Sequence, residues 1–245
     1  MISEFPLFVF TLLGGMGAGA YLFTAFLPRR EGDKPWLFPA IVLVLLAISG
    51  VALLGHLGKP AGMLNAFTNP TSGITLEGLS SIVFGLLVVI DLALTWQKKD
   101  VAIVRIVAAV AGLLLMCAMG YTYWTFIGIP QWGTVECFPL FVLGGISTGA
   151  CLAAFFTQDG YQNAALATGA VVALAAGIVA LLFEGAHFAA VGLDAAPFVV
   201  GAALVAVACG VVLHGRKANA SWVPPCALAI AFIGTAVARY AFYLV

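Results

Sequence analysis

Long apolar stretches, separated by short segments that contain polar residues, glycine or proline, make up nearly the whole chain of 245 residues. A helix needs about 20 apolar residues to cross a bilayer, and eight stretches come close to this length. Because they are continuous and do not alternate with polar residues, they predict membrane-spanning helices rather than the strands of a barrel. The predicted spans are roughly 5–27, 36–57, 74–96, 102–127, 135–156, 163–185, 196–214 and 223–244. The pattern therefore predicts an all-α integral membrane protein with eight transmembrane helices.

The charges in the connections predict the orientation of the bundle. Connections that stay in the cytoplasm are enriched in Lys and Arg. The odd-numbered connections hold seven such residues, whereas the even-numbered connections hold only Lys59. The seven are Arg29, Arg30, Lys34, Lys98, Lys99, Arg216 and Lys217. We therefore expect the odd-numbered connections in the cytoplasm and, because eight is an even number, both termini outside.

Short segments of the first half of the chain recur in the second half. The repeated features are FPLFV at 5–9 and 138–142, GxxxG at 15–19 and 145–149, and VALL at 51–54 and 179–182. A histidine follows each VALL segment. We interpret this as two four-helix halves, 1–127 and 128–245, in the same orientation and related by an axis along the membrane normal. Chance similarity between apolar segments is the alternative.

Composition narrows the class of protein. Apolar residues make up 63% of the chain and charged residues only 8%, which excludes a water-soluble globular protein. Ten Lys and Arg balance ten Asp and Glu without a basic tract, so nothing favours nucleic acid as a partner. The five cysteines form no CxxC pair. We therefore expect neither a zinc site, nor a disulfide framework, nor an iron–sulfur cluster held by this chain.

Most ionisable residues within or beside the spans lie toward the predicted outer end. Charged groups at such depths are costly, which makes them candidates for function. The group comprises Glu4, His56, Lys59, Glu77, Glu136, Glu184, His187, Asp194 and Arg239. We expect any chemistry to take place in the outer leaflet.

His56 and Glu77 form the first candidate pair. His56 ends the second predicted span and Glu77 lies about one turn inside the third, so one connection can bring them into a common pocket. A neutral imidazole and a carboxylate both suit the removal of hydroxyl protons near neutral pH. In an equally open interpretation, the pair only joins two adjacent helices through a hydrogen bond.

Glu184 and His187 form an ExxH motif near the outer end of the sixth span. Di-iron bundles need two such motifs and two further glutamates, which argues against a metal centre. Gating or lining of the outer pocket is one interpretation, and an interfacial cap is the simpler one. A b-type haem between His56 and His187 is a further alternative that the number of histidines leaves open.

Arg239 lies about one turn before the end of the last span, where we expect it to pair with Glu136 or Glu184. Asp91 follows Glu77 by fourteen residues and therefore shares a helix face with it. This spacing predicts either a polar track or, more simply, a side chain that reaches the inner surface.

Aromatic residues gather near the outer ends of the spans. Tyr and Trp at such positions usually form an interfacial belt, although some of them can line a site for a flat ring. The residues concerned are Tyr121, Tyr123, Trp124, Trp132 and Tyr243.

Several of these segments together resemble one family. The run His56-Leu57-Gly58-Lys59-Pro60, followed by Asn65 and Glu77, is similar to the membrane anchor subunit of dimethyl sulfoxide reductase. Weaker similarity extends over the whole chain in order. It comprises EFPL at 4–7, the spaced residues Tyr123, Pro130, Trp132 and Pro139, and the final Arg239, Phe242 and Tyr243.

The resemblance implies a function for the chain. Such a subunit holds an iron–sulfur subunit and a molybdopterin catalytic subunit on the outer side of the cytoplasmic membrane and oxidises menaquinol. His56 and Glu77 match the quinol-site residues of the family, and no haem or iron–sulfur cluster is expected in this chain. Family members often carry an arginine shortly after the HLGxP motif, where this chain has Gly62, and Lys59 can take its place. The further candidates for the quinol pocket are Lys59, Asn65, Tyr123, Glu184, His187 and Arg239.

Three alternatives stand beside this interpretation. A membrane subunit of the polysulfide reductase type would share the eight-helix plan and the quinone chemistry. A cytochrome anchor would carry haem b, whereas a transporter built on the parallel repeat would need no partner subunits.

Overall fold

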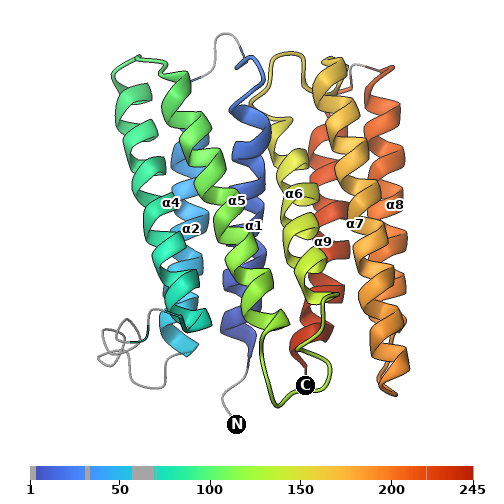
Figure 1. Ribbon diagram of the computed structural model, residues 1–245. Coiled ribbons are helices and arrows are strands. Elements are labelled where there is room, and N and C mark those ends of the chain that lie inside the picture. Colours follow the sequence, from blue (N-terminus) through green and yellow to red (C-terminus); the bar gives the residue numbers. More distant parts are fainter. Residues whose placement is uncertain (1–3, 31–33, 57–68, 70, 219, 245) are drawn as a thin grey trace.

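The structure is a computed structural model that describes residues 4–30, 34–56, 69, 71–218 and 220–244, without the side chain of His56. Within these residues the chain forms eight α-helices, arranged as one bundle of roughly parallel and antiparallel rods (Figure 1). The helices are α1 (Phe5–Thr24), α2 (Leu37–His56), α4 (Gly73–Trp96), α5 (Ala102–Trp124), α6 (Cys137–Ala153), α7 (Ala164–Ala190), α8 (Ala196–Gly215) and α9 (Val223–Tyr243). A short 3-10 helix, η2 (Gly160–Gln162), precedes α7.

All eight predicted spans are confirmed as helices. Seven of the described helices are long and apolar enough to cross a membrane, and α6, with 17 residues, is a shorter apolar helix. Several boundaries differ from the prediction, and α1, α5 and α6 each end three residues before the predicted span. The chain leaves α6 at Ala153 and turns through Asp159, whose φ is 62°. At the other end α7 continues five residues beyond the predicted 185, so Glu184 and His187 lie within its last two turns.

Local sequence explains where several helices begin. The Ser72 side chain accepts a hydrogen bond from the Thr75 amide at 3.3 Å, and the Asn163 side chain accepts from the amides of Ala165 and Leu166. These are N-cap interactions, which satisfy donors that a helix leaves open in its first turn. In a bilayer each helix must satisfy its own backbone groups, so the apolar spans fold as continuous helices.

The helices α1 and α6 form the centre of the bundle. A Cβ atom added at Gly19 would overlap the backbone of Gly145, and one added at Gly149 would overlap the backbone of Gly19 and Ala20. The two GxxxG segments therefore face each other, and small residues let the backbones touch. In Figure 1, α2, α4 and α5 lie on the side of α1, and α7, α8 and α9 lie on the side of α6. The division into two repeated halves stays a prediction.

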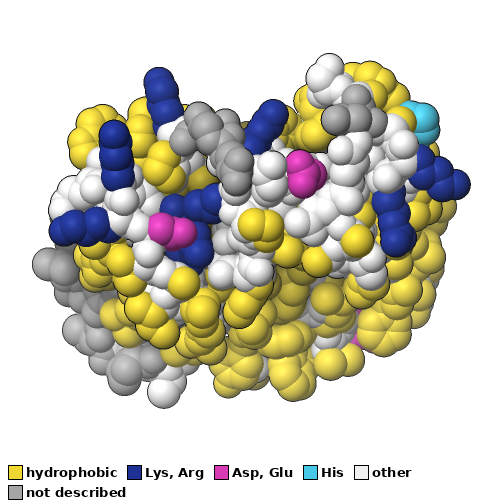
Figure 2. All heavy atoms as spheres, turned by 90° about the horizontal axis from the view of Figure 1, so that it is seen from above, with side chains coloured by type: hydrophobic (Ala, Val, Ile, Leu, Met, Phe, Trp, Pro, Cys, Tyr) yellow, Lys and Arg dark blue, Asp and Glu magenta, His cyan; other side chains and the backbone are white. Residues whose placement is uncertain are grey.

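The two ends of the bundle differ in charge. One end holds both termini and the connections 125–136 and 191–195 and is called the terminal end; the opposite end is called the basic end (Figure 1). Lys and Arg side chains are spread over the basic end (Figure 2). Three ion pairs of the described residues lie there, with Arg105 Nη1 2.9 Å from Asp100 Oδ1, Arg29 Nη2 3.4 Å from Asp91 Oδ2 and Arg29 Nη1 3.6 Å from Asp100 Oδ1.

Candidate functional site

Glu77 is held inside the bundle at the terminal end. It is the fifth residue of α4 and is 2% exposed. The cap at Ser72 fixes the start of the helix, and Gly73 lets α4 approach α5 so closely that an added Cβ would overlap Thr122. The Thr122 side chain lies within hydrogen-bonding reach of the Glu77 carboxyl. The sequence thus places one carboxyl group between α4 and α5.

Two polar atoms on this face of α4 have no hydrogen-bond partner among the described groups. They are Oε1 of Glu77 and Oγ of Ser81, and both are buried. Residues four apart lie above one another on a helix face. A buried polar atom without a partner costs about 1–3 kcal/mol. An additional hydrogen-bonding group would therefore be stabilised at this position.

Tyr123 connects Glu77 with the centre of the bundle. Its ring stacks on Phe141 with centroids 4.6 Å apart and an angle of 7° between the planes. Its hydroxyl lies within hydrogen-bonding reach of the Tyr243 hydroxyl, which is 3.2 Å from Oγ1 of Thr11. Tyr123 also follows Thr122 directly in the chain, and the Thr122 side chain lies within hydrogen-bonding reach of the Glu77 carboxyl. The structure therefore brings two of the predicted pocket residues together.

The expectation of an aromatic belt is confirmed for only part of the group. Tyr121 and Trp124 are each 44% exposed, as an interfacial belt requires. Tyr123, Trp132 and Tyr243 are instead buried, and the Trp132 indole donates to the carbonyl of Phe242 at 3.1 Å. These three rings form a packed layer inside the terminal end, because each has neighbouring rings at 5–6 Å.

Arg239 has different partners from those expected. Its guanidinium donates to three backbone carbonyls, those of Thr11 at 2.8 Å, Leu140 at 3.0 Å and Phe141 at 3.3 Å. The same group lies over the Phe141 ring, 4.8 Å from the centroid. The predicted pairing with Glu136 or Glu184 is therefore wrong. Gly144, beside which Arg239 packs, leaves the space that admits the guanidinium.

Glu184 and His187 lie in the other part of the terminal end. Glu184 is 0% exposed, and neither of its carboxyl oxygens has a hydrogen-bond partner among the described groups. It is near enough to Glu136 for their charges to interact. Nε2 of His187 is 3.3 Å from the carbonyl oxygen of Pro130. The contacts of this motif thus lead to the connection between α5 and α6, and its role in the pocket stays a prediction.

Three predicted residues fall wholly or partly outside the described part of the chain. Lys59 and Asn65 lie outside it, as does the side chain of His56. The helix α2 ends at His56, at the terminal end, and α2 packs against α4. This placement is compatible with a pair between His56 and Glu77, which itself stays a prediction.

Asp91 does not reach the inner surface. It is buried, it accepts a hydrogen bond from the Tyr21 hydroxyl at 3.0 Å, and it pairs with Arg29. Fourteen residues of helix put about 21 Å between Asp91 and Glu77, and the fully buried side chains of Phe84 and Val88 lie between them on α4. Both interpretations of Asp91, a polar track along α4 and a side chain that reaches the inner surface, are therefore wrong.

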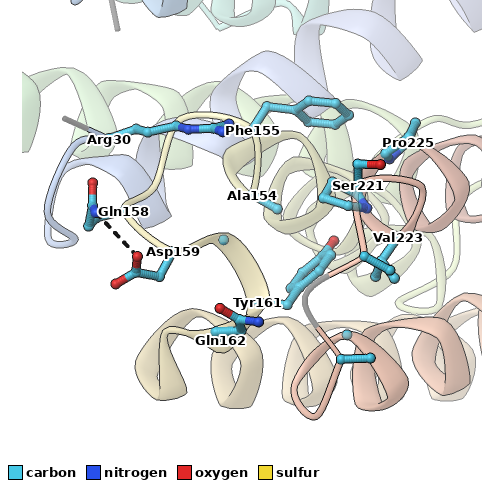
Figure 3. Close-up of a pocket in the computed structure, with 15 residues that line it drawn as sticks. Arg30, Ala154, Phe155, Gln158, Asp159, Tyr161, Gln162, Ser221, Val223 and Pro225 are labelled. Carbon is cyan, nitrogen blue, oxygen red and sulfur yellow. Dashed lines mark hydrogen bonds between the residues drawn. The ribbon is translucent and has the colours of Figure 1, made fainter. Parts of the chain in front are cut away.

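A cavity of about 560 Å³ lies at the basic end (Figure 3). Charged, polar and apolar side chains line it, among them Arg30, Asp159, Tyr161 and Ser221. Burial raises the pKa of the Tyr161 phenol well above its ordinary value. None of the predicted site residues lines this cavity, which is therefore separate from the site around Glu77.

Sequence reasoning missed Ser81 and Thr122 beside Glu77, and Thr11 beside Tyr243. Ser81 could have been found, because it stands one helical turn after Glu77 on the same face. Thr122 and Thr11 carry no comparable signal, since their places depend on how α5 and α1 pack. Among the described residues, no group of three or more His, Cys, Asp and Glu is arranged to hold a metal ion.

Comparison with known proteins adds one result. The model of the family described as DMSO reductase anchor subunit (DmsC) matches residues 1–243. No curated protein matches the chain.

Proposed function

Because the chain belongs to the DMSO reductase anchor subunit (DmsC) family, we propose that it oxidises menaquinol beside Glu77 and passes the electrons to an iron–sulfur partner. The family makes the chain a membrane anchor subunit of a DMSO reductase-type complex. The long apolar helices make it a multi-pass membrane protein. The quinol chemistry and the side of the membrane on which it occurs are the proposed part.

The observation that carries the proposal is the pair of unpartnered polar atoms on α4. Oε1 of Glu77 and Oγ of Ser81 are buried in an apolar bundle, at one end of a helix whose other side carries exposed apolar side chains. A quinol carries two hydroxyl groups on a flat apolar ring. The unpartnered polar atoms of α4 suit the hydroxyl groups, and the aromatic side chains around Tyr123 suit the ring. Buried carboxyl groups within membranes commonly mark proton pathways.

The proposed reaction removes two protons and two electrons from each quinol and leaves a quinone. Glu77 accepts one hydroxyl proton, and the imidazole of His56 accepts the other. The electrons leave one at a time to an iron–sulfur cluster of the partner, which docks at the terminal end. The positive-inside rule places this end outside the cytoplasm, so the protons are released there.

Quinol oxidation by membranes that contain the complex tests this proposal. In Glu77→Gln and His56→Ala variants we expect quinol oxidation to fall at least 100-fold, the scale of a lost general base. Reduction of the terminal acceptor by an artificial dye should stay at the wild-type rate, because the dye bypasses the membrane subunit.

The matched control is Asp91→Asn. Asp91 is a second buried carboxyl on α4, at the opposite end of the helix. Quinol oxidation per assembled complex should be unaffected in this variant. Wild-type quinol turnover in both Glu77→Gln and His56→Ala would refute the proposal.

A further inference from the structure

Arg239 is a buried cation close to the proposed quinol site. It is 1% exposed and lies within α9. Both Nη atoms are engaged by the backbone carbonyls of Thr11, Leu140 and Phe141, while Nε has no hydrogen-bond partner among the described groups. The carbonyls belong to α1 and α6, the two helices whose backbones touch at the centre. The charge is therefore fixed in position.

The ion pairs found among the described residues do not include Arg239. They join Arg29 and Arg105 with Asp91 and Asp100, and all of them lie at the basic end. Carbonyl dipoles solvate a guanidinium without cancelling its charge. A full positive charge in a medium of low dielectric constant acts over a longer distance than it would in water. Burying a charged side chain within a membrane costs free energy, and such residues usually have a function.

Two connections lead from Arg239 toward Glu77. In the first, the guanidinium lies over the Phe141 ring at 4.8 Å, and the ring of Tyr123 stacks on the same Phe141. In the second, the Tyr243 hydroxyl is 3.2 Å from Oγ1 of Thr11, the residue whose carbonyl binds Arg239, and lies within hydrogen-bonding reach of Tyr123. Both connections end at Tyr123, the chain neighbour of Thr122, which contacts Gly73 at the start of α4 and lies within hydrogen-bonding reach of the Glu77 carboxyl.

Among the residues that the structure describes, few other titratable groups lie around Glu77. The helix α5 contributes Tyr123, and α9 contributes Tyr243, which also senses the charge of Glu77. Glu4, at the start of α1, interacts with Tyr123. The helix α2 ends at His56, whose side chain lies outside the described residues. Within the described part of this network, Arg239 is the residue that brings positive charge.

We propose that Arg239 is a positioning residue for quinol oxidation. Its fixed charge orients the hydroxyls of Tyr123 and Tyr243 and stabilises the negative charge that forms beside Glu77 when the quinol loses a proton. This inference rests on the proposed function. It assigns Arg239 no contact with the quinol, since its guanidinium is occupied by carbonyls and by the face of Phe141.

The test compares the pH dependence of quinol oxidation in the assembled complex. A nearby positive charge favours the carboxylate form of Glu77 over the carboxylic acid. If the positive charge is removed, the carboxylate that acts as the base forms only at higher pH. In Arg239→Gln we expect the acidic limb of the rate profile to move to higher pH, together with a lower kcat. Arg239→Lys keeps the charge and should keep the limb near its wild-type position.

Arg105→Gln is the matched control, because Arg105 is a buried arginine at the opposite end of the bundle. Its rate profile should not move. If Arg239→Gln does not assemble, Tyr243→Phe interrupts the second connection with the loss of one oxygen, and it should move the limb in the same direction by a smaller amount.

The possible outcomes separate the two proposals. This inference is overturned if Arg239→Gln lowers the rate but leaves the acidic limb in place, because Arg239 would then be only structural. If Arg239→Gln does not assemble, the same result in Tyr243→Phe overturns it. If Glu77→Gln retains full quinol turnover, the proposed function fails first. Loss of activity in Glu77→Gln, combined with an upward limb shift in Arg239→Gln and none in Arg239→Lys, supports both.

Discussion

At the scale of single residues, the buried charges of this protein are handled in three ways. Asp91 is neutralised by Arg29 and by the Tyr21 hydroxyl. Arg239 is solvated by backbone carbonyls. Glu77 and Glu184 keep carboxyl oxygens without partners among the described groups. The last arrangement leaves carboxyl oxygens able to accept a further hydrogen bond, and for Glu77 this agrees with the proposed role in proton removal.

The Asp91 cluster predicts an effect on stability alone. Breaking a buried ion pair is destabilising, and Arg29 would keep only the exposed carboxylate of Asp100 at 3.6 Å, so Asp91→Asn should lower the free energy of unfolding by about 2–4 kcal/mol. Tyr21→Phe removes one hydrogen bond to the same carboxylate and should cost about 1 kcal/mol. Thermal unfolding of the detergent-solubilised complex measures both effects. Asp91→Asn that unfolds at the wild-type temperature would contradict the assigned pair.

At the scale of helices, the sequence predicted the elements well and their contacts poorly. Every span could be predicted, since a bilayer allows only helices that satisfy their own backbone groups, and length and hydropathy are local properties. The close helix packing at the two GxxxG segments could also be predicted, because small residues at that spacing let two helices approach closely. The carbonyl partners of Arg239 could not be predicted, because Thr11 and Leu140 lie on helices that are far from Arg239 in the sequence. The same reason explains the buried position of Tyr123.

The contact between α1 and α6 makes a prediction for the glycines. Gly149→Ala places a methyl group against the backbone of α1 and should destabilise the protein by about 2 kcal/mol, as overpacking does. Gly85→Ala is the control, because an added Cβ there meets nothing within 4 Å. Alanine at this position should be neutral or stabilising by up to about 1 kcal/mol. Equal unfolding temperatures for the two variants would contradict the packing described for the bundle centre.

At the scale of the whole molecule, the bundle separates two kinds of polar structure. The basic end carries the ion pairs and most of the Lys and Arg side chains (Figure 2). The terminal end carries the buried carboxyls of Glu77 and Glu184, the aromatic layer and Arg239. Fully buried apolar side chains on α4 separate Glu77 from Asp91, so protons from the site have no polar track toward the basic end along that helix. We expect quinol chemistry and partner docking to share the terminal end.

Photochemical labelling locates the quinol most directly. With a photoactivatable menaquinone analogue added to membranes that contain the complex, we expect cross-links to peptides from α4 and α5, around Glu77 and Tyr123. Labelling of these peptides should decrease in Glu77→Gln and persist in Asp91→Asn, which retains the site. Labels confined to α7 and α8, or labels on α4 that are unaffected by Glu77→Gln, would contradict quinol binding at Glu77.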